Sequence, residues 1–468
     1  MSTFSGLNTA LSGLNAARTG LNTVGQNLTN VNTPGYTRQR AEFSGLGAPA
    51  RSTLNDLGVK TGQGVGVTGI SRLGDAFLDA RVRTSFSAAG YTSARAGALN
   101  SIEETINEPG PNGISTQLQE FWTSWGGVAN SPGDTGSTAV LLNKAQTLVQ
   151  SIAAGYKAMD SQWSQTRSSA DAVVADINNT ATQVASLNKA IRSATATGTP
   201  SNELVDQRNT LTARIAQLTG GTVRDLPDGT NEVLLGGNAL VSGTTANGVK
   251  LSGANSMADG GPVQLEWAHR PGAIDLDGGK LAGLLSVLKP ASDGGVIAQT
   301  AESYNTMAQK LAGTVNAVYK AAVAPNGDKD KNFFEVAPGG PAALGLSVGP
   351  KDASNLAVGA QDAGGKDGSM AAAIALLGMG KDSPDALWSG IVVRTGVDIQ
   401  AGLQQAVLAD TSLTNALASQ QSNASVDIDE ENVNLLSFQH AYQAAARVMT
   451  AIDESLDVLI NQTGRVGR

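Results

Sequence analysis

Hydrophobic residues recur at helical spacing through residues 4–31. The seam steps alternately by three and four residues through Leu7, Ala10, Leu14, Ala17, Leu21, Val24, Leu28 and Val31. This spacing predicts a helix that packs lengthwise against another helix. Thr33-Pro34-Gly35 should end it, because proline disfavours the helical conformation in the preceding residue and glycine suits a turn.

The last segment carries a second seam of the same kind. It runs through Leu435, Phe438, Tyr442, Ala445, Met449, Ile452, Leu456 and Leu459. Asp427 and Glu430 fit a capping pair at its start, and Asp429 and Glu431 add negative charge beside the positive end of the helix dipole. The pattern therefore predicts one long seamed helix at each end of the chain.

Between the two seams the pattern is mostly helical. Helices are expected at 72–108 and 114–130, and a long one at 135–194 pairs with 202–218 as an antiparallel hairpin. Short apolar runs separated by Asp-Gly, Gly-Gly and Asn-Gly indicate β-hairpins at 221–275. Helix returns at 280–288 and 296–323, and a further helix is expected over 397–421.

We therefore expect a mainly α fold with β-rich insertions: terminal helices paired as a coiled coil, a long helical middle domain and a small outer β or irregular domain. The expected divisions are 1–40 (first helix and turn), 41–220 (linker and helical domain), 221–275 (β-hairpins), 276–323 (helical domain continued), 324–390 (small outer Gly/Ala-rich insertion), 391–428 (return helix and linker) and 429–468 (last helix).

Composition narrows the functional classes. At 468 residues the chain should form two to four folded units. It has no cysteine and only two histidines, His269 and His440, so thiolate chemistry is excluded and multi-histidine metal sites are disfavoured. The net charge of −8 argues against nucleic-acid or anionic-membrane partners. We expect no enzyme activity, cofactor or metal.

The N-terminal sequence does not resemble a secretory signal, because Gly6, Asn8, Ser12, Gly13 and Asn15 interrupt any apolar run. No stretch approaches eighteen consecutive apolar residues, so we expect no spanning helix. Composition leaves open whether the protein stays in the cytosol or is exported unfolded.

Charge and energetics suggest that the two ends belong together. Residues 1–40 carry +3 and residues 429–468 carry −3. One buried seam offsets only part of the entropy lost on ordering two long helices. Gly6, Gly13 and Gly20 weaken the first helix further, but their spacing of seven forms a lane that another backbone could approach. We hypothesise that both ends are mobile in the monomer and order against neighbouring subunits; a plain intramolecular coil is the alternative.

Two motifs carry a resemblance to a known family. Asn27-Leu28-Thr29-Asn30-Val31-Asn32-Thr33-Pro34-Gly35-Tyr36-Thr37-Arg38-Gln39 resembles the signature near the N-terminus of bacterial flagellar rod, hook and hook-associated proteins, with Thr29 where alanine is commoner. The segments 442–449 and 452–460 are similar to the family's C-terminal motif. Within that family, the long helical middle, with Gly278-Gly279-Lys280-Leu281 and Asn332-Phe333-Phe334, resembles the first of the two hook-associated junction proteins.

The resemblance implies a structural adapter, exported unfolded by the flagellar type III machinery, that forms a ring between hook and filament outside the cell. Implied partners are further copies of the chain, the hook protein, the second hook-associated junction protein and a cytosolic export chaperone. The chaperone would bind the C-terminal helix, with Leu435, Tyr442, Met449 and Leu456 as contacts. The remaining expected assembly residues are those of the two seams.

Several features that suggest chemistry have plainer interpretations. Gly64-Val65-Gly66-Val67-Thr68-Gly69 matches G-x-G-x-x-G, but no acidic residue follows between Val82 and Ile102, so a glycine-rich strand is favoured over a nucleotide site. Trp122 and Trp125 fit a core face better than a ligand site, and His440 fits a polar flank of the seam better than a catalytic base. We expect Tyr36, Arg38 and Arg40 to dock the first helix on the next domain.

Other functions remain open at this point. A flagellar hook or rod protein would share the terminal motifs but have a shorter or mostly β middle. A coiled-coil surface adhesin would share only the seams. An enzyme would need an acid, base and nucleophile constellation, which the sequence does not offer.

Overall fold

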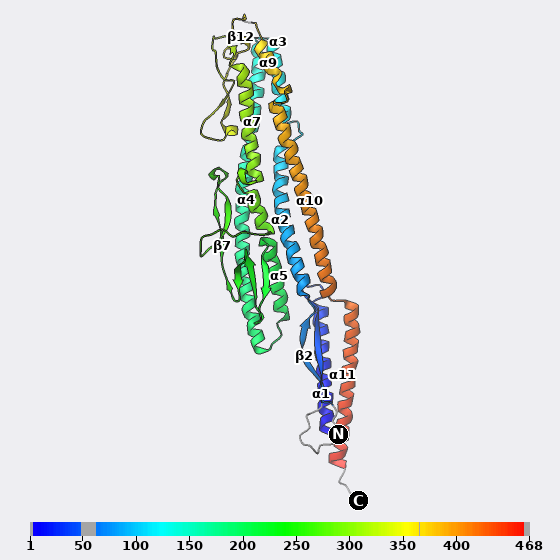
Figure 1. The fold of residues 1–468 in the computed structure, drawn as a ribbon. Coiled ribbons are helices and arrows are strands. Elements are labelled where there is room, and N and C mark those ends of the chain that lie inside the picture. Colours follow the sequence, from blue (N-terminus) through cyan, green and yellow to red (C-terminus); the bar gives the residue numbers. More distant parts are fainter. Residues whose placement is uncertain (1–2, 48–61, 365, 463–468) are drawn as a thin grey trace.

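The computed structural model describes residues 3–47, 62–364 and 366–462 and shows a long, narrow molecule (Figure 1). Both chain ends lie at the same extremity, where α1 (Thr3–Thr29) runs beside α11 (Ile428–Asp457). A π-helical turn, η4 (Val458–Gln462), extends α11. We call α1 and α11 the terminal pair. The prediction of a mainly α fold with paired terminal helices is confirmed.

A two-stranded antiparallel ribbon leads from the terminal pair to the rest of the chain. It consists of β1 (Gln39–Leu46) and β2 (Gly64–Arg72), with an irregularity between Glu42 and Phe43. The ribbon packs along α1. The G-x-G-x-x-G sequence lies within β2, where its glycines are part of an extended strand and form no phosphate-binding loop.

The helical domain, residues 76–424, forms the body of the molecule. Its main helices are α2 (Ala76–Ile106), α3 (Ile114–Asn130), α4 (Thr135–Thr197), α5 (Asn202–Thr219), the short α6 (Gly279–Val287), α7 (Val296–Tyr319) and α10 (Pro384–Ala424). α4 packs against both α5 and α7, and α10 runs along α2 (Figure 1). The predicted hairpin of α4 and α5 is confirmed, whereas α10 begins at Pro384, well before the expected Val397, because Ser383 caps it and Trp388 is buried in the core.

Small β elements line one side of α4. β3 (Thr222–Asp225), β4 (Asn231–Leu235), β5 (Asn238–Ser242) and β6 (Thr245–Ala246) form one antiparallel sheet, and β7 (Val249–Gly253) pairs with β8 (Val263–Trp267). The turn η1 (Met257–Asp259) lies between the last two. Val233, Leu235 and Leu265 are buried with the helices, so these hairpins belong to the same core.

The end farthest from the terminal pair is built from α3 and from residues 322–383. These include β9 (Ala322–Val323), β10 (Phe334–Val336), α8 (Ala342–Gly345), β11 (Leu346–Val348), β12 (Gly359–Ala360), α9 (Ser369–Ala375) and η3 (Leu377–Met379); η2 (Ala291–Asp293) lies nearer α7. Phe333 is fully buried against Trp125, Phe121 and Tyr319. Residues expected in a small outer insertion therefore contribute to the main aromatic core.

Glycine is required where α6 begins. Gly279 has φ +82, and a side chain there would place its Cβ 2.4 Å from the backbone nitrogen of Thr219. Beside it, a Cβ on Gly278 would lie 2.3 Å from the Ser87 hydroxyl. The Gly278-Gly279-Lys280 run thus lets α6 pack closely against α2 and the end of α5.

Candidate functional site

The glycine lane of α1, formed by Gly6, Gly13 and Gly20, faces α11 of the same chain. A Cβ on Gly20 would lie 2.6 Å from the Phe438 ring, one on Gly6 3.2 Å from Ile452, and one on Gly13 3.9 Å from Ala445. The lane lets a second helix approach closely, as its spacing predicts. In this structure that helix is the chain's own C-terminal helix.

Because the glycines of α1 form the contact with α11, the leucines of the α1 seam lie at the edge of that contact. Ala10, Ala17 and Val24 are buried, but the leucine lane, defined as Leu7, Leu14, Leu21 and Leu28, is only half-buried, as is Val31. On α11 the half-buried seam residues are Leu435, Phe438, Met449, Ile452 and Leu456, while Tyr442 and Leu459 are exposed. The terminal pair therefore forms through small residues and leaves much of its larger apolar surface open.

The two-stranded ribbon covers another side of α1, around Ser12. The Val65 amide donates to the Ser12 hydroxyl at 3.2 Å, and the Phe43 and Phe438 rings lie 6.0 Å apart. Ser12 and Leu14 are two residues apart, which is about 200° around a helix, so the leucine lane lies away from the ribbon.

Asn27 is the centre of a buried polar cluster at the end of α1. Only 1% of this residue is exposed. Its amide nitrogen donates to the Gln39 carbonyl at 2.9 Å and to Glu431 at 3.0 Å, and its carbonyl oxygen accepts from the Tyr36 hydroxyl at 2.9 Å and the Gln39 amide at 3.0 Å. One side chain thus joins α1, the turn, the ribbon and α11.

Arg38 ties the same turn to the start of α11. Its guanidinium donates to Glu431 at 2.8 Å and to Glu430 at 2.9 Å, and these bonds raise its pKa despite partial burial. Asp427 caps α11 as predicted, but the Glu430 carboxylate pairs with Arg38. The Arg38 side chain thus binds α11, while its main-chain amide donates to the Ala424 carbonyl at the end of α10 at 2.9 Å. Arg40 pairs with Glu42 on the ribbon.

Another cluster fastens this region to the helical domain. Buried Asp206 on α5 accepts from the Thr37 amide at 3.0 Å and from Arg72 at 2.7 Å. Burial raises the pKa of Asp206 more than these partners lower it. Asn202 bridges the Gln39 side chain and the ribbon backbone. We call the two polar clusters together the joint.

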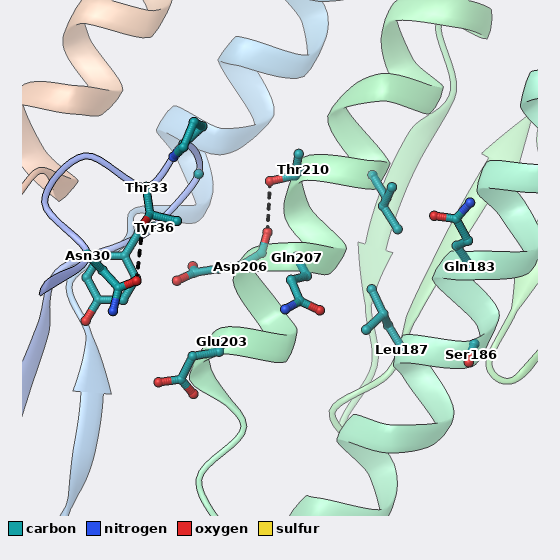
Figure 2. Close-up of a pocket in the computed structure, with 13 residues that line it drawn as sticks. Asn30, Thr33, Tyr36, Gln183, Ser186, Leu187, Glu203, Asp206, Gln207 and Thr210 are labelled. Atoms are coloured by element: carbon teal, nitrogen blue, oxygen red, sulfur yellow. Dashed lines mark hydrogen bonds between the residues drawn. The ribbon is translucent and has the colours of Figure 1, made fainter. Parts of the chain in front are cut away.

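The turn that follows α1 lies between two hollows. Figure 2 shows the first, of about 610 Å³, between Asn30, Thr33, Tyr36 and the facing sides of α4 and α5. The second, of about 670 Å³, opens toward α2 and the end of α10. Gly35 has φ +80, and a Cβ there would meet the Thr210 hydroxyl at 2.6 Å. Asn32, Thr33, Pro34 and Gly35 are exposed, and the Thr33 hydroxyl donates to Asn30.

These contacts give Tyr36, Arg38 and Gly35 of the family motif a structural role, which the sequence indicated only in part. Burial, with Glu203, Asp206 and Glu431 nearby, raises the pKa of Tyr36 to about 12, so its hydroxyl stays protonated and donates to Asn27. Sequence reasoning missed the roles of Asn27, Arg72 and Asp206. A polar Asn27 beside the apolar seam was the one available signal.

The other sequence candidates take structural positions. Trp125 is fully buried, and the Trp122 indole donates to Asp385 at 2.7 Å, so both belong to the core. His440 is exposed on α11. Within the described residues no three acidic or histidine side chains gather as a metal site, and no helix is long and apolar enough to cross a membrane.

Comparisons with known proteins agree with this architecture. Residues 99–334 match the family model described as the flagellar hook-associated protein FlgK helical domain. Residues 7–37 match the flagella basal body rod protein family and residues 419–462 the C-terminal family of the flagellar basal body rod FlgEFG proteins.

Relatives extend over the whole chain. Flagellar hook-associated protein 1 of Bacillus subtilis is 28% identical over all of both chains. The Escherichia coli protein of that name is 31% identical over 76% of this chain and 63% of its own length. A solved structure of the flagellar hook junction protein FlgK from Burkholderia pseudomallei shares the fold, with a TM-score of 0.61 and 16% identity over 74% of this chain and all of its own.

Paired terminal helices of the rod-protein type, joined to a long helical body, define a structural protein of the flagellar axis. The match of residues 99–334 to the FlgK helical domain narrows this class of protein further. The chain belongs to the flagellar hook-associated protein FlgK family.

Proposed function

We propose that this protein is a structural adapter that joins the flagellar hook to the filament and is required for filament assembly. The observation that carries the proposal is the open apolar surface of the terminal pair, in a chain whose body matches the FlgK helical domain. The match of the middle also favours this function over a hook or rod protein, whose terminal families the chain shares.

The exposed apolar surface supports assembly with other subunits. Large apolar side chains on α11 that are half or more exposed include Val433 (66%), Leu436 (55%), Val448 (50%) and, just beyond it, Leu459 (52%) and Ile460 (73%). Several large apolar side chains left in water on one helix favour a surface that a partner covers. The partners in this proposal are further copies of the chain, the hook protein and the second hook-associated junction protein, in an extracellular ring.

Before export the same surface would need protection in the cytoplasm. In this proposal an export chaperone covers α11 through Leu435, Tyr442, Met449 and Leu456, and the flagellar type III machinery then exports the chain. Tyr442 is 37% exposed, and the other three proposed contacts, Leu435, Met449 and Leu456, are half-buried. A chaperone can therefore reach these side chains only in part unless α11 separates from α1.

Electron microscopy of cells lacking the gene tests the function. We expect hooks without filaments and flagellin shed into the medium, because filament subunits would have no adapter to grow on. A Leu14→Asp protein should fail to restore filaments, whereas Val140→Asp, at an exposed position on α4, should restore them. Normal filaments in the deleted strain would contradict the proposal.

We also propose that the terminal pair, although folded, is mobile in the free protein and becomes rigid only when neighbouring subunits cover it. Hydrogen exchange on the free protein should show faster exchange in α1 and α11 than in α4 and α7, since so few large side chains are buried between the terminal helices. Exchange equally slow in both regions would contradict it.

A further inference from the structure

We propose that the hollow of about 670 Å³ between the turn after α1, α2, α5 and the end of α10 binds an oxyanion, with the Arg83 guanidinium as its main ligand. We call it the Arg83 hollow. The occupant is a carboxylate or phosphate group. This inference does not depend on the proposed adapter function.

Arg83, on α2, is a half-buried cation without a partner. Among the residues that the structure describes, its guanidinium makes no hydrogen bond and no ion pair. Burial lowers the pKa of Arg83, although the Asp79 and Asp225 carboxylates act in the opposite direction. Taking a charge out of water costs free energy unless a counter-charge or hydrogen bonds replace the water. An anion beside Arg83 would supply both.

The carboxylate best placed to neutralise Arg83 is bonded elsewhere. Asp79 precedes Arg83 by four residues on α2, which is the usual spacing for an ion pair along a helix. Its two carboxylate oxygens instead accept from the Gln420 amide on α10 at 2.6 Å and from the Asn209 amide on α5 at 3.2 Å. Asp79 therefore ties three helices together and leaves Arg83 unpaired.

The other cations that line the Arg83 hollow have carboxylate partners. Arg72 lies 2.7 Å from Asp206, and Arg214 lies 2.6 Å from Asp176 on α4. Within the described ranges of the chain, Arg83 is thus the one cation lining this hollow that lacks a carboxylate. The vacant ligand position is specific to one side chain, which makes it testable by a single substitution.

A second donor marks the side of Arg83 on which an anion would lie. Gln217 on α5 is half-buried, lines the same hollow, and its side chain bonds to no other described residue. Its carbonyl oxygen would lie 2.3 Å from a Cβ on Gly90, seven residues beyond Arg83 on α2. Asp79 lies in the other direction along α2. An anion on the Gln217 side of Arg83 therefore gains an amide donor and stays away from the Asp79 carboxylate.

The chemistry of the guanidinium selects the class of occupant. Its planar fork of N–H groups matches the paired oxygens of a carboxylate or a phosphate. Such a group bonded to Arg83 and Gln217 would link α2 to α5 beside the turn and so oppose local opening there. Two sources offer this chemistry: a free anion in the medium and an acidic side chain of another chain.

Hydrogen exchange of the full chain in dilute solution tests the free anion. Inorganic phosphate or citrate is compared with sodium chloride at matched ionic strength. At ten times the dissociation constant, exchange in residues 76–90 should slow about tenfold. Arg83→Gln should abolish this protection and Arg83→Lys should retain only part of it, because an ammonium cannot bind two oxygens in a fork. Arg81→Gln, at an exposed position on the same helix, is the matched control and should keep the protection.

A second arm tests the acidic side chain. The protein concentration is raised without phosphate or citrate, and slowing of residues 76–90 that is lost in Arg83→Gln would assign the oxyanion to another chain. Slowing in the dilute first arm would assign it to a free anion.

The stability of the substituted protein adds an independent check. In sodium chloride alone, Arg83→Gln should exchange no faster than the wild type in residues 76–90, since it removes a cation that has no counter-charge. Faster exchange would show that Arg83 already stabilises the fold and would overturn the proposal. Protection that is equal in wild type and Arg83→Gln, or absent from both arms, would overturn it as well, and all of these results leave the adapter function standing.

Discussion

The helical domain and the terminal pair are both built from long helices, yet they are stabilised very differently. In the helical domain Trp125, Trp163 and Phe333 are almost wholly buried. In the terminal pair the buried apolar residues are small, such as Ala10 and Ala17, and its leucines are half-exposed. The stabilisation from apolar burial scales with the area removed from water, so each large buried side chain contributes more to the body than each buried alanine does to the pair.

The largest effect should come from the aromatic core. Phe333→Ala should lower the free energy of unfolding of the helical domain by about 3–5 kcal/mol, because it leaves a cavity among four aromatic rings. Leu14→Ala is the counterpart in the terminal pair and should cost less than about 1.5 kcal/mol. Chemical denaturation measures both, and equal losses would contradict the comparison.

The next largest effect should lie in the joint. Asn27→Ala removes four hydrogen bonds from a buried cluster and leaves Glu431 bonded to Arg38 alone among these residues, so the attachment of α1 should weaken by about 2–3 kcal/mol. Hydrogen exchange should quicken in α1 and α11 while α4 stays protected. An equal rise of hydrogen exchange in α4 would show that the substitution destabilises the helical domain as well as the joint.

A pair of glycine substitutions sharpens the comparison within one helix. Gly20→Ala places a methyl group 2.6 Å from the Phe438 ring and should loosen the terminal pair by about 1–2 kcal/mol. Gly25→Ala meets nothing within 4 Å and should stabilise α1 by up to about 1 kcal/mol through helix propensity. Hydrogen exchange in α1 should become faster in Gly20→Ala and slower in Gly25→Ala. Faster exchange in both variants would mean that glycine is needed along the whole helix.

The smallest effect concerns pH. The pKa of Tyr36 is raised to about 12, so its contribution to stability is complete below pH 10 and is lost as the pH rises through 12. Tyrosinate absorbance of the wild type minus that of Tyr36→Phe should show a single late titration near 12. A difference curve centred at 10 would show that the Tyr36 hydroxyl is not buried beside the Glu203, Asp206 and Glu431 carboxylates.

Much of the candidate site could be read from the sequence, but its contacts could not. The signature from Asn30 to Arg38 and the two seams were recognisable from spacing and residue type. The bond between Asn27 and Glu431 joins residues 404 positions apart, and the link of Arg72 to Asp206 spans 134. No local pattern specifies such pairs, because a polar side chain chooses its partner only after the helices are packed.

The sequence by itself determined the long helices, their periodicity, the glycine spacing and the turn after α1, since these depend on local conformational preferences and the helical repeat. Only the tertiary structure decided that the glycines rather than the leucines face α11, and that the Arg38 side chain binds α11. The reason is steric: α11 lies closest to α1 where no side chain intervenes, and that approach leaves the leucines at the edge and brings Glu430 and Glu431 within reach of Arg38.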